Sequence, residues 1–94
     1  MEPLLTVAVL TYNGNHLLEA CYRSIQAQRM HLPGDTEFLL VDNGSCVPPL
    51  PPPEGWRVTR LPANIGNIGG MNVCFRQARG EWVLFVANDV RLYP

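Results

Sequence analysis

The sequence has few charged residues, and this limits the partners that the protein can bind. Charged residues make up 16% of its 94 residues, and the formal net charge is −1. A nucleic-acid backbone is held by a basic stripe, which this sequence lacks, so we expect no nucleic-acid partner. The hydrophobic share of 47% is nevertheless that of a globular chain and not of a disordered one.

Cysteine is also scarce, and the sequence has no long hydrophobic run. The 3 cysteines are widely spaced and form no C-x-x-C pair, which argues against both a disulfide framework and a zinc site. The apolar run behind the acidic N-terminus is too short for a signal-peptide core or a transmembrane helix. We therefore expect reduced thiols, no membrane span in this chain and a cytoplasmic location.

Several catalytic signatures are missing as well. The sequence has no G-x-S-x-G, no H-E-x-x-H and no cysteine–histidine signature, and His16 and His31 have no partners at ligand spacing. No Gly-Lys-Ser/Thr follows the glycines of residues 64–72, so they do not form a Walker loop. Their G-x-x-G-G spacing, behind the third predicted strand, also differs from the dinucleotide-binding fingerprint, which disfavours hydride transfer.

What the sequence does contain is an alternation of apolar strands and helices, in a single partial domain of residues 1–94. Strands are predicted at residues 4–10, 37–41, 56–61 and 82–87, and helices at 16–29 and 71–79. The first and last strands are near-continuous apolar runs, typical of burial on both faces, whereas the third alternates and belongs at an edge. We predict that the proline-rich connection, residues 47–55, is a surface connector.

This order, β-α-β-β-α-β, predicts an α/β fold with an open, Rossmann-like, mostly parallel sheet. With right-handed crossovers the most economical strand order is 3-2-1-4, which puts the reversal of winding between the first and fourth strands. Ligands in open α/β sheets bind beside the carboxyl ends of the strands at such a reversal. The polar segments expected to converge there are Thr11, Tyr12 and Asn13; Asp42 and Asn43; residues 64–72; and Asn88 and Asp89.

The glycine-rich segment, residues 64–72, has the composition of a loop beside a ligand. Glycine lets the backbone approach a ligand closely, and asparagine amides donate and accept hydrogen bonds without charge. The helix expected from Met71 to Arg79, with Gly80 ending it, presents an N-terminus that favours an anion. One interpretation is therefore a phosphate and its metal, and the other is a helix cap and a turn without a ligand.

The two acids at strand ends have different candidate roles. Asp42 could accept hydrogen bonds from a ribose hydroxyl or a base N–H, or it could cap its own loop. Asp89 is the better metal candidate, because magnesium commonly takes only one or two protein carboxylates and completes its shell with water and phosphate oxygens. A metal there would neutralise the charge that builds on a departing diphosphate. The alternative for Asp89 is an ion pair with Arg91.

Taken in order, residues 7–13, 40–45, 64–72 and 80–85 resemble the N-terminal half of a family-2 glycosyltransferase of the GT-A fold. The glycine-rich segment is similar to that of the rhamnosyltransferase-like branch, whose enzymes act in surface polysaccharide biosynthesis. The resemblance implies a nucleoside-diphosphate sugar as donor, magnesium or manganese as cofactor, and a carbohydrate or lipid-linked acceptor in the full-length enzyme. It also implies inverting transfer to an acceptor hydroxyl that a downstream acid deprotonates.

The resemblance assigns roles to residues by position. Residues 64–72 would approach the diphosphate-sugar side, and Asp89 would be the last acid of the family's Asp-x-Asp metal motif. Thr11, Tyr12, Asn13 and Asp42 would line the nucleoside pocket. The further residues implied in substrate binding are Asn43, Asn64, Gly66, Gly69, Gly70, Asn72 and Asn88. No catalytic residue is expected in this chain, because the family's base belongs to the acceptor-binding half, downstream of Pro94.

Departures from the family pattern leave other interpretations open. Ala87 stands where the first acid of the metal motif would be, Cys46 and Val47 replace the usual Thr/Ser-Asp, and the sequence ends at Pro94. Because the strand at 82–87 would lack cover on its far edge, we expect a truncated domain, or one completed by another chain or a dimer partner. The alternatives to a donor-binding half are a non-catalytic nucleotide-binding or interaction module and a proline-tract adaptor.

Overall fold

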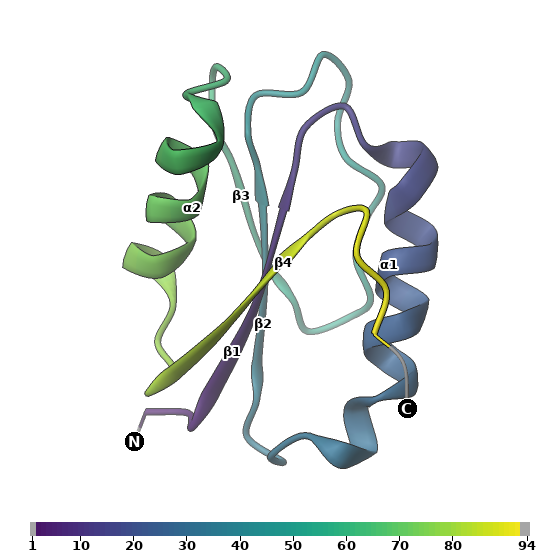
Figure 1. Ribbon diagram of the computed structural model, residues 1–94, viewed down its shortest axis with the longest axis vertical. Helices are drawn as coiled ribbons and strands as arrows, with labels where there is room; N and C mark the ends of the chain where they lie inside the picture. The colour runs from purple at the N-terminus through teal and green to yellow at the C-terminus, as the bar shows by residue number, and fades with distance from the viewer. Residues whose placement is uncertain (1, 93–94) are drawn as a thin grey trace.

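Four parallel strands form one sheet with a helix on each face (Figure 1). The computed structural model describes residues 2–92. In chain order the elements are β1 (Leu5–Thr11), α1 (Asn15–Ala27), a short 3₁₀ turn (Arg29–His31), β2 (Glu37–Asp42), β3 (Arg57–Arg60), α2 (Gly66–Gln77) and β4 (Trp82–Ala87). The strand order is β3-β2-β1-β4 and each neighbouring pair is parallel, which confirms the predicted α/β fold and its 3-2-1-4 order.

β1 and β2 lie in the middle of the sheet and are covered on both faces, as the apolar run of β1 predicts. On one face Val9 packs in a cluster with Leu18 and Ile25 of α1, and on the other Leu39 packs with Cys74 of α2. All five side chains are 0% exposed. Successive strand residues point to opposite faces, so a strand with a helix on each side needs apolar residues at every position. Burying a side chain such as Leu18 contributes about 1.5–3 kcal/mol.

The cysteines are free thiols in the described part of the chain. Cys21 belongs to the cluster under α1 and Cys74 to the cluster under α2. Burial raises the pKa of both thiols to about 11. Both are therefore neutral side chains of the core at physiological pH.

The prediction that the last strand is buried on both faces is wrong for the described residues. In β4, Trp82 is 67% exposed and Leu84 is 38% exposed, and only Val86 is buried. β4 pairs with β1 on one side and forms an edge of the sheet. Its apolar composition suits an interior strand, but only Val83 and Phe85, on the side of α2, pack against a core cluster along with the buried Val86.

The start of α1 is not capped by Asn13 or Asn15, although asparagine is a common N-cap residue. Gly14 is the N-cap, and no side chain makes a capping hydrogen bond. The two asparagine amides bond to the segment after β2 instead: Asn13 Oδ1 accepts from the Cys46 N–H at 2.9 Å, and Asn15 Nδ2 donates to the Pro48 carbonyl at 3.0 Å. Tertiary contacts therefore replace the local cap.

Most of the glycine-rich segment is helix and not loop, because α2 begins at Gly66 and not at Met71. Gly70 explains part of the composition, since a Cβ there would come within 2.8 Å of Leu10 Cδ1. Glycine thus lets the helix pack closely on β1. The helix ends at Gln77, before the predicted stop at Gly80. Within residues 2–92, no helix combines the length and the hydropathy of a membrane span.

The proline-rich connection lies along α1 and is held there by its own backbone. The Leu50 N–H donates to Asn15 Oδ1 at 2.9 Å, and the Tyr22 hydroxyl donates to the Leu50 carbonyl at 2.9 Å. Trp56, just behind the connection, stacks on Phe38 with ring centroids 5.3 Å apart. The Leu50 backbone and the Pro48 carbonyl are therefore engaged inside the protein.

At the amino ends of the strands, a single carboxylate joins several elements. Glu37 accepts hydrogen bonds from the Thr6 hydroxyl at 2.8 Å, from Arg57 Nε at 2.9 Å and from the Arg79 N–H at 2.9 Å. Burial by itself raises the pKa of Glu37, but the hydrogen bonds from Arg79, Thr6 and Arg57 outweigh it. The net effect is a pKa below the ordinary 4.5.

We predict an acid-labile contribution to stability from Glu37. A lowered pKa means that the stabilisation is present above the unfolded-state value of 4.5 and is lost as the pH falls through the lower folded-state value. Glu37→Gln should therefore flatten the fall in melting temperature below about pH 4.5. The matched control is Glu19→Gln, because the Glu19–Arg23 pair is exposed. Equal acid profiles for Glu37→Gln and the unmodified protein would contradict the prediction.

Candidate functional site

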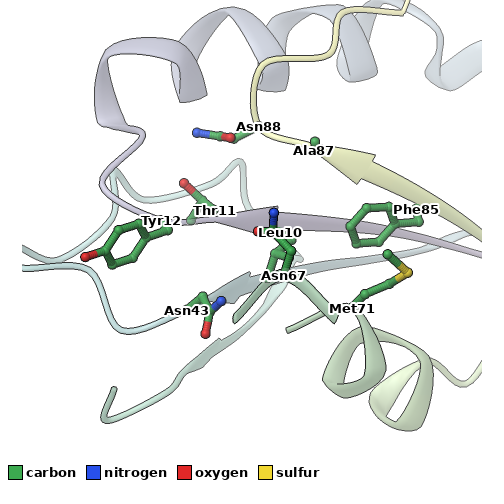
Figure 2. Close-up of a pocket in the computed structure, with 9 residues that line it drawn as sticks. All are labelled: Leu10, Thr11, Tyr12, Asn43, Asn67, Met71, Phe85, Ala87 and Asn88. Carbon is green, nitrogen blue, oxygen red and sulfur yellow. The ribbon is translucent and has the colours of Figure 1, made fainter. Parts of the chain in front are cut away.

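The polar segments predicted to converge meet at the carboxyl ends of the strands. Thr11 is in register with Asp42 across β1 and β2, and Leu10 is in register with Ala87 across β1 and β4. A pocket of about 360 Å³ lies between these strand ends and α2. Its lining, drawn in Figure 2, consists of Leu10, Thr11, Tyr12, Asn43, Asn67, Met71, Phe85, Ala87 and Asn88. The volume falls in the range of roughly 300–1,000 Å³ that is typical of small-ligand sites.

The predicted site residues divide between the pocket and its surroundings. Those that line it are Thr11, Tyr12, Asn43 and Asn88, and those that do not are Asn13, Asp42, Asn64, Gly66, Gly69, Gly70, Asn72 and Asp89. The expectation that residues 64–72 lie at the site did not single out Asn67 and Met71, which lie one helical turn apart on α2; a helix start at Gly66 would have revealed them. Sequence reasoning missed Leu10, Phe85 and Ala87, because apolar residues at strand ends read as core.

The pocket has a polar end and an apolar end, and no charged side chain lines it. Figure 2 shows Thr11, Tyr12, Asn43 and Asn88 toward one end, and Met71 and Phe85 together at the other. Tyr12 is 46% exposed, so an aromatic face is open to a ligand at the rim. The apolar end continues outward into an aromatic contact between Phe85 and Phe75, with centroids 6.2 Å apart.

Thr11 combines a place in the pocket lining with a buried polar side chain. Its side chain is 2% exposed, and among residues 2–92 its hydroxyl has no hydrogen-bond partner. A buried hydroxyl without a partner costs free energy, and native structures rarely leave one so. This oxygen lies beside Gly14, where a Cβ would come within 2.8 Å of it, and because the oxygen is itself buried, Thr11 borders the pocket with its other atoms.

Asn43 fixes the start of α2 beside the pocket. Its side chain is 2% exposed; its Oδ1 accepts from the Ile65 N–H at 3.0 Å, and its Nδ2 donates to the Gly66 carbonyl at 3.0 Å. α2 has no side-chain cap of its own. The first-turn N–H groups, with the positive end of the helix dipole, thus lie next to Asn67 at the pocket wall.

Asp42 is fully buried and its carboxylate is engaged inside the protein. Its Oδ1 accepts from the Ser45 hydroxyl, and its Oδ2 accepts from Arg60 Nε at 3.2 Å. In this arrangement the carboxylate closes its own loop. A contact with a ribose or a base would require Ser45 or Arg60 to give way.

Asp89 lies at the carboxyl end of β4, at the same end of the sheet as Asn13. Next to it, Asn88 is so close to Gly14 that a Cβ on that glycine would fall 1.6 Å from Asn88 Nδ2. Burial is the main cause that raises the pKa of Cys21 on α1, and the negative charge of Asp89 is the second cause. The Asp89 carboxylate is therefore within electrostatic reach of that helix. Among the described residues, no salt bridge joins Asp89 to Arg91.

A divalent ion at Asp89 would find few other protein ligands. Within residues 2–92, no group of three or more His, Cys, Asp or Glu side chains is placed to hold a metal. Magnesium commonly uses one or two carboxylates and takes water and substrate phosphates for the rest. The residues at this strand end therefore fit an ion that binds together with a phosphate ligand, and do not fit one that binds alone.

Comparison with known proteins agrees with this geometry. The family model described as "Glycosyl transferase family 2" matches residues 6–94. The structure resembles S. aureus TarS 1–349, with a TM-score of 0.74 and 27% sequence identity over 92% of this chain. It also resembles S. aureus TarS 1–349 in complex with UDP, with a TM-score of 0.73 and 26% identity. No curated protein gives a significant sequence match.

The chain is much shorter than these neighbours. It covers 27% of TarS 1–349, both alone and in the UDP complex, and 16% of the longer TarS structure. Over the part that is matched, the GT-A neighbours have the same α/β sheet with strand order 3-2-1-4.

Proposed function

Because the chain belongs to glycosyl transferase family 2, we propose that it binds the nucleotide-sugar donor of an inverting, metal-assisted glycosyltransferase. It would be the donor-binding half of that enzyme. The observation that carries the proposal is an uncharged pocket of about 360 Å³ at the carboxyl ends of β1, β2 and β4. That UDP is bound in a TarS structure of similar fold supports the choice of a nucleoside diphosphate.

The nucleoside would occupy the polar end of the pocket. Tyr12 presents an aromatic face on which a base can stack, and such stacking is worth about 1–3 kcal/mol. The Asn88 amide would hydrogen-bond the ribose or the base, and Thr11 would border it. None of these contacts needs a charged side chain, in keeping with the neutral lining.

The diphosphate would lie between the start of α2 and the end of β4. First-turn N–H groups and the Asn67 amide would donate to its oxygens. Asp89 would hold magnesium or manganese jointly with the phosphates, and a bound ion would supply the Lewis acid that stabilises a leaving diphosphate. The sugar would then face Met71 and Phe85, an apolar wall that suits a deoxy sugar and hence the rhamnosyltransferase-like branch.

This chain would bind and orient the donor but would not deprotonate the acceptor. Among the described residues, no acid or histidine lines the pocket, so no general base stands beside the donor. The acceptor, a carbohydrate or a lipid-linked carbohydrate of polysaccharide biosynthesis, and the base would belong to the other half of the enzyme. We place this reaction in the cytoplasm.

We expect calorimetric titration with UDP- and dTDP-sugars to show binding that manganese strengthens. Asp89→Asn should weaken binding in manganese by roughly tenfold or more and remove the effect of the metal. Glu81→Gln is the matched control, because Glu81 is an exposed acid at the opposite end of β4. It should leave the affinity unchanged.

The same titration separates the proposal from a non-catalytic nucleotide-binding or interaction module. Ala87 in place of an acid is the observation that favours the module. Nucleotide binding that ignores manganese and tolerates Asp89→Asn would support the module. A protein that binds no nucleotide sugar under any condition would refute the donor-binding half and the nucleotide-binding module, and would leave the interaction module.

A further inference from the structure

A hydrogen-bond network around the buried Asp42 carboxylate, outside the pocket, ties the ends of β1, β2 and β3 together. Arg60 Nε donates to Asp42 at 3.2 Å, and Arg60 Nη2 donates to the Ser45 carbonyl at 3.0 Å. The Ser45 hydroxyl donates to Asp42 and accepts from the Asn13 N–H at 2.8 Å. Asn13 Oδ1 in turn accepts from the Cys46 N–H at 2.9 Å. Arg60, on the edge strand β3, is thereby connected to the loop after β1.

The network ends at a residue with an unusual backbone conformation. Asn13 has φ +49° and is the only described residue besides glycine with a positive φ. Left-handed backbone costs free energy in a residue with a Cβ, so it persists where surrounding contacts hold it. The bonds from Ser45 and Cys46 are such contacts. The two residues before it, Thr11 and Tyr12, line the pocket.

We propose that Arg60 is a positioning residue for the ligand pocket. By orienting Asp42 and Ser45, it holds Asn13 in its left-handed conformation and so keeps Thr11 and Tyr12 in place at the rim. Arg60 itself does not line the pocket and would not touch a bound ligand. The effect on nucleotide affinity rests on the proposed function, whereas the effect on the loop after β1 does not.

An ion pair that only stabilises the fold should leave the pocket unchanged when it is removed, and β3 contains such a pair for comparison. Arg57, at the other end of the strand, pairs with Glu37 at 2.8 Å. The two arginines have similar exposure, 34% for the Arg57 side chain and 43% for Arg60. Each binds a carboxylate of β2 that is largely or fully buried, but the Arg57 pair is remote from the pocket. Replacing either arginine should lower the free energy of unfolding, but only the replacement of Arg60 should change the pocket.

The test compares Arg60→Gln with Arg57→Gln by amide hydrogen exchange and by titration with UDP and manganese. In Arg60→Gln, the amides of Asn13 and Cys46 should exchange at least about tenfold faster relative to global unfolding, and UDP should bind about tenfold more weakly. In Arg57→Gln both quantities should match the unmodified protein. If Arg60→Gln does not fold, Ser45→Ala breaks the next link and should give the same results.

Each outcome of this test either supports or overturns the positioning role of Arg60. Equal exchange at Asn13 in the Arg60→Gln and Arg57→Gln variants would overturn the proposal, whether or not any nucleotide binds. Faster exchange with unchanged UDP affinity would also overturn it, because the loop would then move without affecting the pocket. Tighter UDP binding in Arg60→Gln would overturn it in favour of direct contact between Asp42 and the ligand. Faster exchange in a protein that binds no nucleotide would support the positioning of the loop and refute the proposed function separately.

Discussion

Replacing Gly44 with alanine is expected to lower the free energy of unfolding by about 3 kcal/mol or more. Gly44 has φ +76°, and a Cβ there would lie 2.3 Å from the carbonyl carbon of Ala63 and 2.4 Å from the backbone nitrogen of Asn64. Both clashes are with backbone, so no side-chain rotation can relieve them. The turn after β2 and the segment before α2 would have to separate, which disturbs the start of α2 beside the pocket.

Gly55→Ala is the matched control for this effect. Gly55 has φ +92°, but a Cβ there meets nothing within 4 Å. Its substitution carries the cost of left-handed backbone alone, which is about 1–2 kcal/mol. Urea denaturation of the two variants measures the difference. Equal losses would show that the approach of Gly44 to residues 63 and 64 does not matter for stability.

The second large effect is expected from Asn43→Ala. The substitution removes the hydrogen bonds to the Ile65 N–H and the Gly66 carbonyl, with a loss of about 2 kcal/mol in the free energy of unfolding. It also releases the start of α2 from the sheet. Because Asn67 and the first-turn N–H groups depend on that attachment, nucleotide affinity should fall by roughly tenfold or more.

Asn64→Ala tests whether the location of the amide decides the effect. Asn64 Oδ1 also bonds the start of α2, accepting from the Gly66 N–H at 2.7 Å, but this contact is exposed. Water can replace it, so the loss should be about 0.5 kcal/mol. Thermal denaturation and UDP titration give both quantities. A larger loss for Asn64→Ala than for Asn43→Ala would refute the assigned role of Asn43.

The sheet could be predicted from the sequence because its central strand carries a local signal. Residues 4–10 are apolar at nearly every position, and β1 is indeed covered by α1 and α2. The same apolar pattern gave a wrong prediction for β4. The composition of a strand indicates which environment suits it, but not which parts of the fold cover it. Trp82 and Leu84 are exposed since the described residues place nothing on that part of the sheet.

The start of α2 could not be predicted because its cause is not local. Glycines disfavour helix, so residues 66–70 read as loop. The helix forms there because Asn43, more than 20 residues away in the chain, holds Ile65 and Gly66. The polar ends of the strands were correctly expected to meet, since parallel strands impose that. Which of those side chains face inward depends on partners such as Ser45 and Arg60, whose positions only the folded chain defines.

The pairing of β1 with both β2 and β4 has a consequence for how the chain acquires its structure. The strand made first lies between partners made later, and contacts such as the Gly80 N–H to the Thr6 hydroxyl span 74 positions. Closing so long a loop is entropically unfavourable until the contacts form, and sheets of this kind assemble slowly. On the ribosome, β1 must therefore wait with one side unpaired until β4 has emerged, and in that interval it is open to chaperones and to aggregation.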